Sequence, residues 1–149
     1  MSEKPEFNGI ERRLDELSER LRRLEPIREK SLDEFLQDVY LRDIVERNLE
    51  IAIQCCIDIA NRLISLERAP KPRDSYESIL RLGELDVLPP AFARELAPIA
   101  GLRNILAHEY LAIDWYLVYE RLQRLNDLDR FADYLRGWLR SRFERDDAV

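Results

Sequence analysis

Apolar residues recur every three to four positions along most of the chain, and this spacing constrains the fold more than any other feature. Such residues line one face of a helix, whereas a half-buried strand needs strict alternation, and no strand-length alternating run occurs. The chain has only 4 glycines in 149 residues, which favours long helices. The pattern predicts an all-α, up-down bundle of about five helices. We expect one domain over residues 1–149, frayed at residues 1–6 and 144–149.

Proline and capping residues divide the first half into segments. The first helix begins at Phe7 and should end near Pro26, because proline disfavours helical geometry in the residue before it. Ser31 has a glutamate three residues later, which predicts a capping box and a new helix. From about residue 41 to residue 66, apolar residues cover more than one face. This helix is therefore expected at the centre of the bundle.

The second half carries similar signals. Asp74 should cap a short helix that Gly83 can close. Pro98 and Gly101 are expected to kink the helix that follows or to break it in two. Asp114 can cap the next helix, and the Asn126–Asp127 pair should interrupt it before a last helical stretch.

Composition excludes several classes of protein. A hydrophobic content of 46% does not suit a disordered chain, and a net charge of −6 argues against a general nucleic-acid coat protein. No apolar run is long enough to span a membrane. Cys55 and Cys56 are adjacent in a helical pattern, which is not a metal-ligand spacing. They are expected to be small core residues of a cytoplasmic protein.

One short region is basic although the chain is acidic. A local charge of +3 there could bind an RNA backbone, and the alternative is an ordinary solvated loop. The count is four basic residues against one acidic residue: Arg62, Arg68, Lys71 and Arg73 against Glu67.

The residues best suited to catalysis lie close together near position 105. His108 is the only histidine of the chain, and Arg103 lies five residues before it. Histidine can act as acid or base near neutral pH, and arginine is a permanent clamp for phosphate. Asn104 lies one helical turn before His108, so its amide could orient the imidazole or hold a phosphate oxygen. This set of residue types suits cleavage of a phosphodiester without a metal ion or cofactor.

The spacing also raises a difficulty. Five residues rotate two side chains by about 140° on a regular helix, so Arg103 and His108 do not share a face. A symmetric homodimer would resolve this by bringing two copies of each residue into one cleft. On spacing alone, a salt bridge and a capping residue are the structural alternative. Similarly, Tyr110 could be a packed aromatic residue, and Asp58 could pair with Arg103 or face solvent.

The segment Arg103-Asn104-Ile105-Leu106-Ala107-His108-Glu109-Tyr110 resembles the R-x4-H-x-Y motif of HepT-type toxins of the HEPN superfamily. The resemblance implies a homodimeric, metal-independent RNA endonuclease in a toxin–antitoxin pair. It also implies that Arg103 and His108 are catalytic, that Asn104 supports them, and that cleavage leaves a cyclic phosphate. The family's antitoxin is an MntA-type nucleotidyltransferase, and Tyr110 corresponds to the tyrosine to which it attaches AMP.

Two further functions remain as alternatives. The first is a non-catalytic HEPN scaffold that binds the nucleotidyltransferase, or is modified by it, without cutting RNA. The second is a purely structural helical dimer, which gives no reason for the motif. The presence of both Arg103 and His108 favours the enzyme, since a scaffold does not need them.

Overall fold

The computed structural model describes residues 5–147, and the all-α prediction is confirmed. The described residues form eight α-helices and two 3-10 turns, a finer division than the expected five or so helices. The elements in chain order are η1 (Pro5–Phe7), α1 (Asn8–Arg28), α2 (Leu32–Gln37), α3 (Val39–Leu66), α4 (Ser75–Glu84), α5 (Pro90–Leu96), α6 (Ile99–His108), η2 (Tyr110–Ala112), α7 (Trp115–Leu122) and α8 (Asn126–Asp147).

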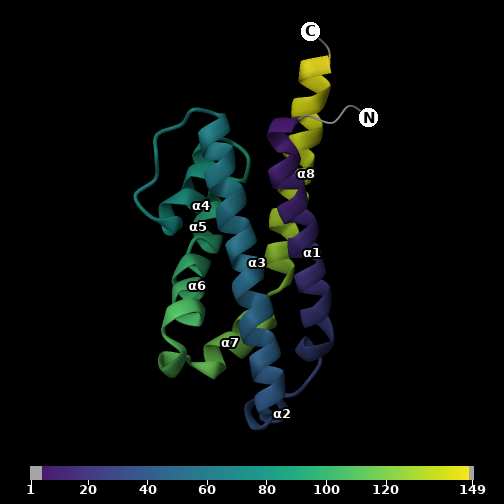
Figure 1. The fold of residues 1–149 in the computed structure, drawn as a ribbon, viewed down its shortest axis with the longest axis vertical. Coiled ribbons are helices and arrows are strands. Elements are labelled where there is room, and N and C mark those ends of the chain that lie inside the picture. Colours follow the sequence, from purple (N-terminus) through teal and green to yellow (C-terminus); the bar gives the residue numbers. More distant parts are fainter. Residues whose placement is uncertain (1–4, 148–149) are drawn as a thin grey trace.

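Helix α3 is the central element (Figure 1). Helices α1 and α3 run antiparallel beside each other, and α8 lies alongside α1. Helices α4 and α6 contact the other side of α3, and α5 packs on α4. Helices α2 and α7 contact each other at one end of the bundle. The two sides of α3 therefore carry different assemblies, which explains why its apolar residues cover more than one face.

The core confirms the helical periodicity. Cys55 and Cys56 are buried free thiols within α3, as the sequence predicted. Burial raises the pKa of Cys55 to about 11 and raises the pKa of Cys56 well above its ordinary value. Both are core residues and not nucleophiles. The main apolar contributions of α1 and α3 are Ile10, Leu14, Leu17, Leu21, Leu24, Leu49, Ile53, Ile57, Ile59 and Leu63.

Three predicted helix starts are confirmed by hydrogen bonds. The Ser31 hydroxyl accepts from the backbone N–H of Glu34, and the Glu34 carboxylate accepts from the N–H of Ser31, which completes the capping box. Asp74 accepts from the N–H of Glu77 at 2.8 Å at the start of α4. Asp114 accepts from two backbone N–H groups at the start of α7.

Two predicted boundaries were wrong by a few residues. Helix α1 continues through Pro26 to Arg28. Proline removes the hydrogen bond of residue 26 to the preceding turn, and the burial of Ile27 in the core offsets part of that cost. The interruption expected at Asn126–Asp127 falls at residues 123–125, and Asn126 begins α8. Leu125 is completely buried between the two helices, so the turn itself belongs to the core.

The expected role of Gly83 was also wrong. Helix α4 continues to Glu84, and no glycine of the described residues has a positive φ. Gly83 is buried instead where α4 meets α5, and a Cβ atom there would lie 3.0 Å from Ala93 Cβ and 3.2 Å from Pro90 Cα. It therefore serves close packing. The break at Pro98 is confirmed, since α5 ends at Leu96 and α6 begins at Ile99, whereas Gly101 lies inside α6 and causes no break.

The expectation about the chain ends falls partly outside the described residues. Pro5 and Glu6 belong to η1, and residues 144–147 continue α8, whereas residues 1–4 and 148–149 are not described. Of the helices between residues 5 and 147, none combines the length and the apolar character that a membrane crossing requires.

Candidate functional site

Helix α6 carries the predicted catalytic residues and ends at His108. Its first turn is fixed in the core by Ile99 and Ala100, and its last turn by Leu106. After His108 the backbone leaves helical geometry at Glu109, with φ −126° and ψ 51°. The candidate site therefore lies at the surface end of a helix that packs on the core through its first and last turns.

Arg103 is held by two other helices. Its Nη1 donates to the side-chain oxygen of Gln54 on α3, and its Nη2 donates to the Ser75 hydroxyl at 3.2 Å, at the start of α4. Its Nε is buried without a hydrogen-bond partner in the described part of the chain. The guanidinium group is thus half-buried and fixed in position, and Nη1 and Nη2 each retain an N–H that an anionic ligand could accept from.

Asp58 neither pairs directly with Arg103 nor stands alone in solvent, so neither alternative considered for it was right. Gln54 donates through its amide nitrogen to Asp58 at 2.8 Å and accepts from Arg103 through its amide oxygen. Asp58 also accepts from Arg13 of α1 at 3.5 Å. Gln54 therefore connects the carboxylate to the guanidinium, and one chain of polar contacts runs from α1 across α3 to α6.

His108 and Asn104 are exposed at the end of α6. Neither side chain forms a hydrogen bond or an ion pair within residues 5–147. The structural alternative for His108 was helix capping, yet the cap contact at this end is the Glu109 N–H donating to the Ile105 carbonyl. The imidazole and the amide are both free to meet a ligand.

Tyr110 is the first residue of η2 and is 72% exposed. It is therefore not the packed aromatic residue that the sequence left as an alternative. Tyr119 provides a contrast, because its hydroxyl donates to the Lys30 carbonyl at 2.6 Å and its ring packs on Phe35. These contacts fix α7 against the end of α1 and against α2. The short segment carrying Tyr110 is thus held between two anchored helices.

The surface around Tyr110 is apolar. Leu111 is 88% exposed, and Tyr116 and Leu117 of α7 are 63% and 56% exposed. A second group of exposed apolar residues lies on α2 and the start of α3, the elements that meet α7 at this end of the bundle (Figure 1). Its members are Leu32, Val39, Tyr40 and Ile44. We call these eight exposed residues, which lie on the elements at this end of the bundle, the apolar end surface.

The basic region predicted between residues 62 and 73 is divided in the structure. Arg73 pairs with Glu77 at 2.6 Å, which raises the pKa of Arg73 and lowers that of Glu77. Arg62, Arg68 and Lys71 form no ion pair with the described residues. Among the described residues 5–147, no three or more His, Cys, Asp or Glu side chains are grouped so that they could hold a metal ion.

Sequence reasoning missed Gln54 and Ser75. Gln54 lies four residues before Asp58 in an apolar stretch, so the two polar residues share a helix face. That spacing was a usable signal for a polar contact on α3. Nothing in the sequence pointed to Ser75, because its contact with Arg103 depends on how α4 docks against α6.

Comparison with known proteins agrees with the observed fold. A family model described as Ribonuclease HepT-like matches residues 17–135. A protein named tRNA nuclease HepT, from Aphanizomenon flos-aquae, is 36% identical over 105 residues, which are 70% of this chain and 71% of that protein. A protein named mRNA nuclease HepT, from Shewanella oneidensis, is 31% identical over 105 residues, 70% of this chain and 79% of that protein.

A solved structure extends the comparison to three dimensions. It is a tri-AMPylated HEPN toxin of Shewanella oneidensis in complex with its MNT antitoxin. Its fold matches with a TM-score of 0.78 and 26% identity, over 87% of this chain and 98% of that chain. The predicted HEPN-like bundle is thereby confirmed.

Proposed function

The chain belongs to the HepT-like ribonuclease family, and we propose that it is the RNA-cutting toxin of a toxin–antitoxin pair. As an enzyme it is an endoribonuclease. The catalytic residues of the proposal are Arg103 and His108, with Asn104 in support. The observation that carries it is the contrast within α6: a guanidinium held by Gln54 and Ser75, and a free imidazole at the helix end.

The proposed reaction uses the 2′-hydroxyl of the RNA as the nucleophile. One histidine removes the proton of the 2′-hydroxyl, and the 2′-oxygen attacks the adjacent phosphorus. A second histidine protonates the departing 5′-oxygen. The products are a 2′,3′-cyclic phosphate and a 5′-hydroxyl. Arg103 stabilises the charge that develops on the phosphorane oxygens. Because its guanidinium is already fixed, little reorganisation is needed during the reaction.

We infer that the second histidine comes from another copy of the chain. Arg103 is directed toward α3 and α4, whereas His108 lies exposed at the tip of α6. The apolar end surface begins directly after His108 and offers a face for a symmetric contact. In such a homodimer, His108 of each chain would meet His108 and Arg103 of the other.

We further propose that a nucleotidyltransferase antitoxin inactivates the enzyme by attaching AMP to Tyr110. The hydroxyl of Tyr110 is on an exposed side chain two residues after His108. A bulky anionic group there would obstruct the histidine and repel the phosphates of the RNA. The AMPylated toxin among the similar structures supports this assignment.

The test is RNA cleavage by purified protein in EDTA, beside His108→Ala and Arg103→Ala. We expect the wild type to produce fragments with cyclic phosphate ends and both variants to lose cleavage while keeping their circular dichroism spectra. If the folded wild type with unmodified Tyr110 does not cut RNA, the enzyme proposal fails and the non-catalytic scaffold is supported.

A further inference from the structure

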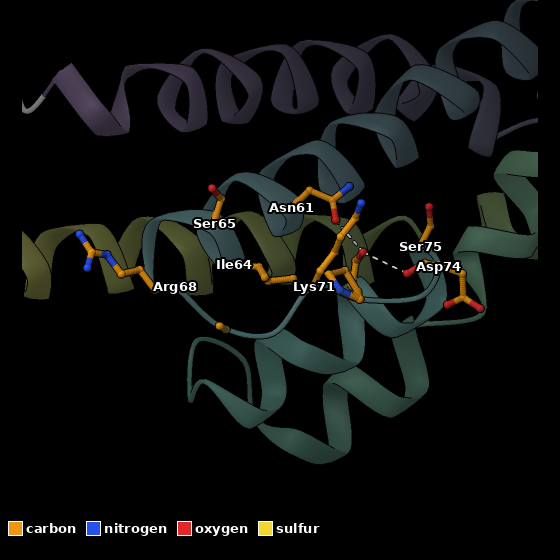
Figure 2. Close-up of a pocket in the computed structure, with 10 residues that line it drawn as sticks. Asn61, Ile64, Ser65, Arg68, Lys71, Asp74 and Ser75 are labelled. Atoms are coloured by element: carbon orange, nitrogen blue, oxygen red, sulfur yellow. Dashed lines mark hydrogen bonds between the residues drawn. The ribbon is translucent and has the colours of Figure 1, made fainter.

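A pocket of about 630 Å³ lies between the end of α3, the start of α4 and the loop that joins them. Its volume falls in the range of about 300–1,000 Å³ that is usual for small-molecule sites. We call it the loop pocket. Figure 2 shows Arg68 and Ser75 at its opposite ends; the other lining residues are Asn61, Ile64, Ser65, Ala69, Lys71, Pro72, Asp74 and Ser78.

The loop pocket shares a residue with the proposed catalytic site. Ser75 lines the pocket, and its hydroxyl accepts the hydrogen bond from Arg103 Nη2 at 3.2 Å. The Arg103 guanidinium therefore lies directly behind one end of the pocket. An RNA strand with one phosphate at Arg103 could place the next nucleotide along the strand inside the loop pocket.

The pocket is held open by the fold. The buried Arg81 of α4 donates to the carbonyl of Pro70 and pairs with Glu77, which fastens the connecting loop to α4. At the other end, Arg68 lies two residues after the end of α3 and has a φ of 54°, so the backbone turns away from the helix axis. The pocket is therefore preformed and needs little ordering on binding.

The chemistry of the lining suits a nucleotide. Arg68 and Lys71 are exposed and carry no ion pair within residues 5–147, so both are available to phosphate. Asn61 uses its amide oxygen to accept from Ser78 at 2.6 Å, which leaves its amide N–H groups to donate. Ile64 and Pro72 supply an apolar wall for a base.

One charge in the lining opposes an anion. Asp74 lies at the Ser75 end of the pocket, where its carboxylate accepts from the N–H of Glu77 in the cap of α4. The phosphate is therefore expected away from Asp74, where Lys71 beside Asn61 and Arg68 at the far end supply positive charge (Figure 2).

We propose that the loop pocket binds one nucleotide of single-stranded RNA next to the phosphate that is cut, with its base in the pocket and with Lys71 and Arg68 supplying the positive charge for its phosphate. This inference rests on the proposed function, because it names a binding site for the same substrate. It also gives a role to the basic region that the sequence analysis left open.

Two kinds of variant test the pocket. Arg68→Asn combined with Lys71→Gln removes both charges, and asparagine tolerates the positive φ at position 68. Ser65→Phe fills the pocket from an exposed helix position without a change of charge. The matched control is Arg12→Gln with Arg140→Gln, which removes two exposed charges that carry no ion pair among the described residues, on α1 and α8.

The measurement is the Kd for a short single-stranded RNA, taken in the His108→Ala background so that the RNA stays intact. We expect the double charge variant to raise Kd about tenfold and to lower the slope of log Kd against log salt by about 0.7 for each charge. We expect Ser65→Phe to raise Kd without changing that slope, and the control to change Kd little. In the enzyme with His108 intact, the pocket variants should raise KM more than they lower kcat.

The outcomes separate the two proposals. If the wild type cuts RNA but the pocket variants bind it like the control, the loop pocket proposal is overturned and the enzyme stands. A charge effect without a Ser65→Phe effect also overturns it, because the phosphate then binds outside the pocket. If the wild type neither binds nor cuts RNA, the proposed function itself fails.

Discussion

Gln54 accepts a hydrogen bond from Arg103, which lies 49 positions later in the sequence. The same side chain donates to Asp58 at 2.8 Å, so the amide is fixed from both ends. Gln54 therefore fixes the position of the guanidinium group. Gln54 should therefore be important for catalysis.

Replacing Gln54 by alanine should lower kcat for RNA cleavage by roughly 10-fold to 100-fold, because a displaced Arg103 no longer meets the phosphorane. RNA binding in the His108→Ala background should change little. The double variant Gln54→Ala/Arg103→Ala should be no worse than Arg103→Ala alone. Losses that add up in the double variant would indicate a general structural effect and contradict the positioning role.

Tyr110→Phe should abolish AMPylation by a nucleotidyltransferase of the MntA type, since the modified hydroxyl is absent. Tyr116 is the matched control, because it is 63% exposed and lies on the same apolar end surface. Tyr116→Phe should be modified like the wild type. Intact-protein mass spectrometry of each variant after incubation with ATP and the antitoxin measures the result. Continued modification of Tyr110→Phe would assign the site to another residue.

Leu111→Glu should convert a homodimer into a monomer, because it places a charge on an 88% exposed side chain of the apolar end surface. Sedimentation velocity gives the mass, and cleavage should fall with the dimer fraction. Tyr76→Ser is the control, since it removes an exposed aromatic residue from α4. An active monomer would contradict the shared site.

Gly83→Ala should destabilise the protein, whereas Gly137→Ala should stabilise it. Alanine favours a helix interior over glycine by about 1 kcal/mol, which applies in full at Gly137 inside α8 and less at Gly83, one residue before the end of α4. At Gly83 the added methyl meets Ala93 at 3.0 Å, and overpacking of this kind costs about 1–3 kcal/mol. At Gly137 the nearest atom is a flexible arginine nitrogen at 4.0 Å. Thermal unfolding should show Tm shifts of opposite sign, of about 2–4 °C per kcal/mol.

Cys55 should resist alkylation by iodoacetamide at pH 8 in the folded protein. With its pKa raised to about 11, only about 0.1% of the thiol is ionised at that pH. Unfolding in guanidinium chloride returns the pKa toward its ordinary value, so both cysteines should then react rapidly. Labelling followed by mass spectrometry compares the two conditions. Fast labelling of the folded chain would contradict the buried, protonated state.

Local signals in the sequence predicted the helices and many of their ends. Ser31, Asp74 and Asp114 satisfy backbone groups within a few residues of themselves, so their roles can be inferred from neighbouring letters. Pro26 and Gly83 could not be interpreted in that way. Their roles depend on what surrounds them in space: the core beside Ile27, and the close approach of α5.

The candidate site shows the same division. The residue types and spacing of Arg103 and His108 indicated a phosphodiester chemistry, and the motif indicated a family. The partners of Arg103 could not be predicted, because they depend on the rotation of α3 and α4 about their axes. Asp58 illustrates the limit, since the sequence marked it as unusual but did not show that Gln54 stands between it and Arg103.

The two partners of Arg103 determine when, during folding, its guanidinium group becomes fixed. Gln54 and Ser75 belong to different helices, and the loop between those helices is fastened through Arg81 and Pro70. A chain still emerging from the ribosome therefore lacks the fixed guanidinium until α3, α4 and α6 have all docked. A single proteolytic cut in that loop would loosen the same arrangement. The proposed catalytic arginine is therefore in place only when folding is complete, so the proposed cleavage activity would arise at the last step of folding.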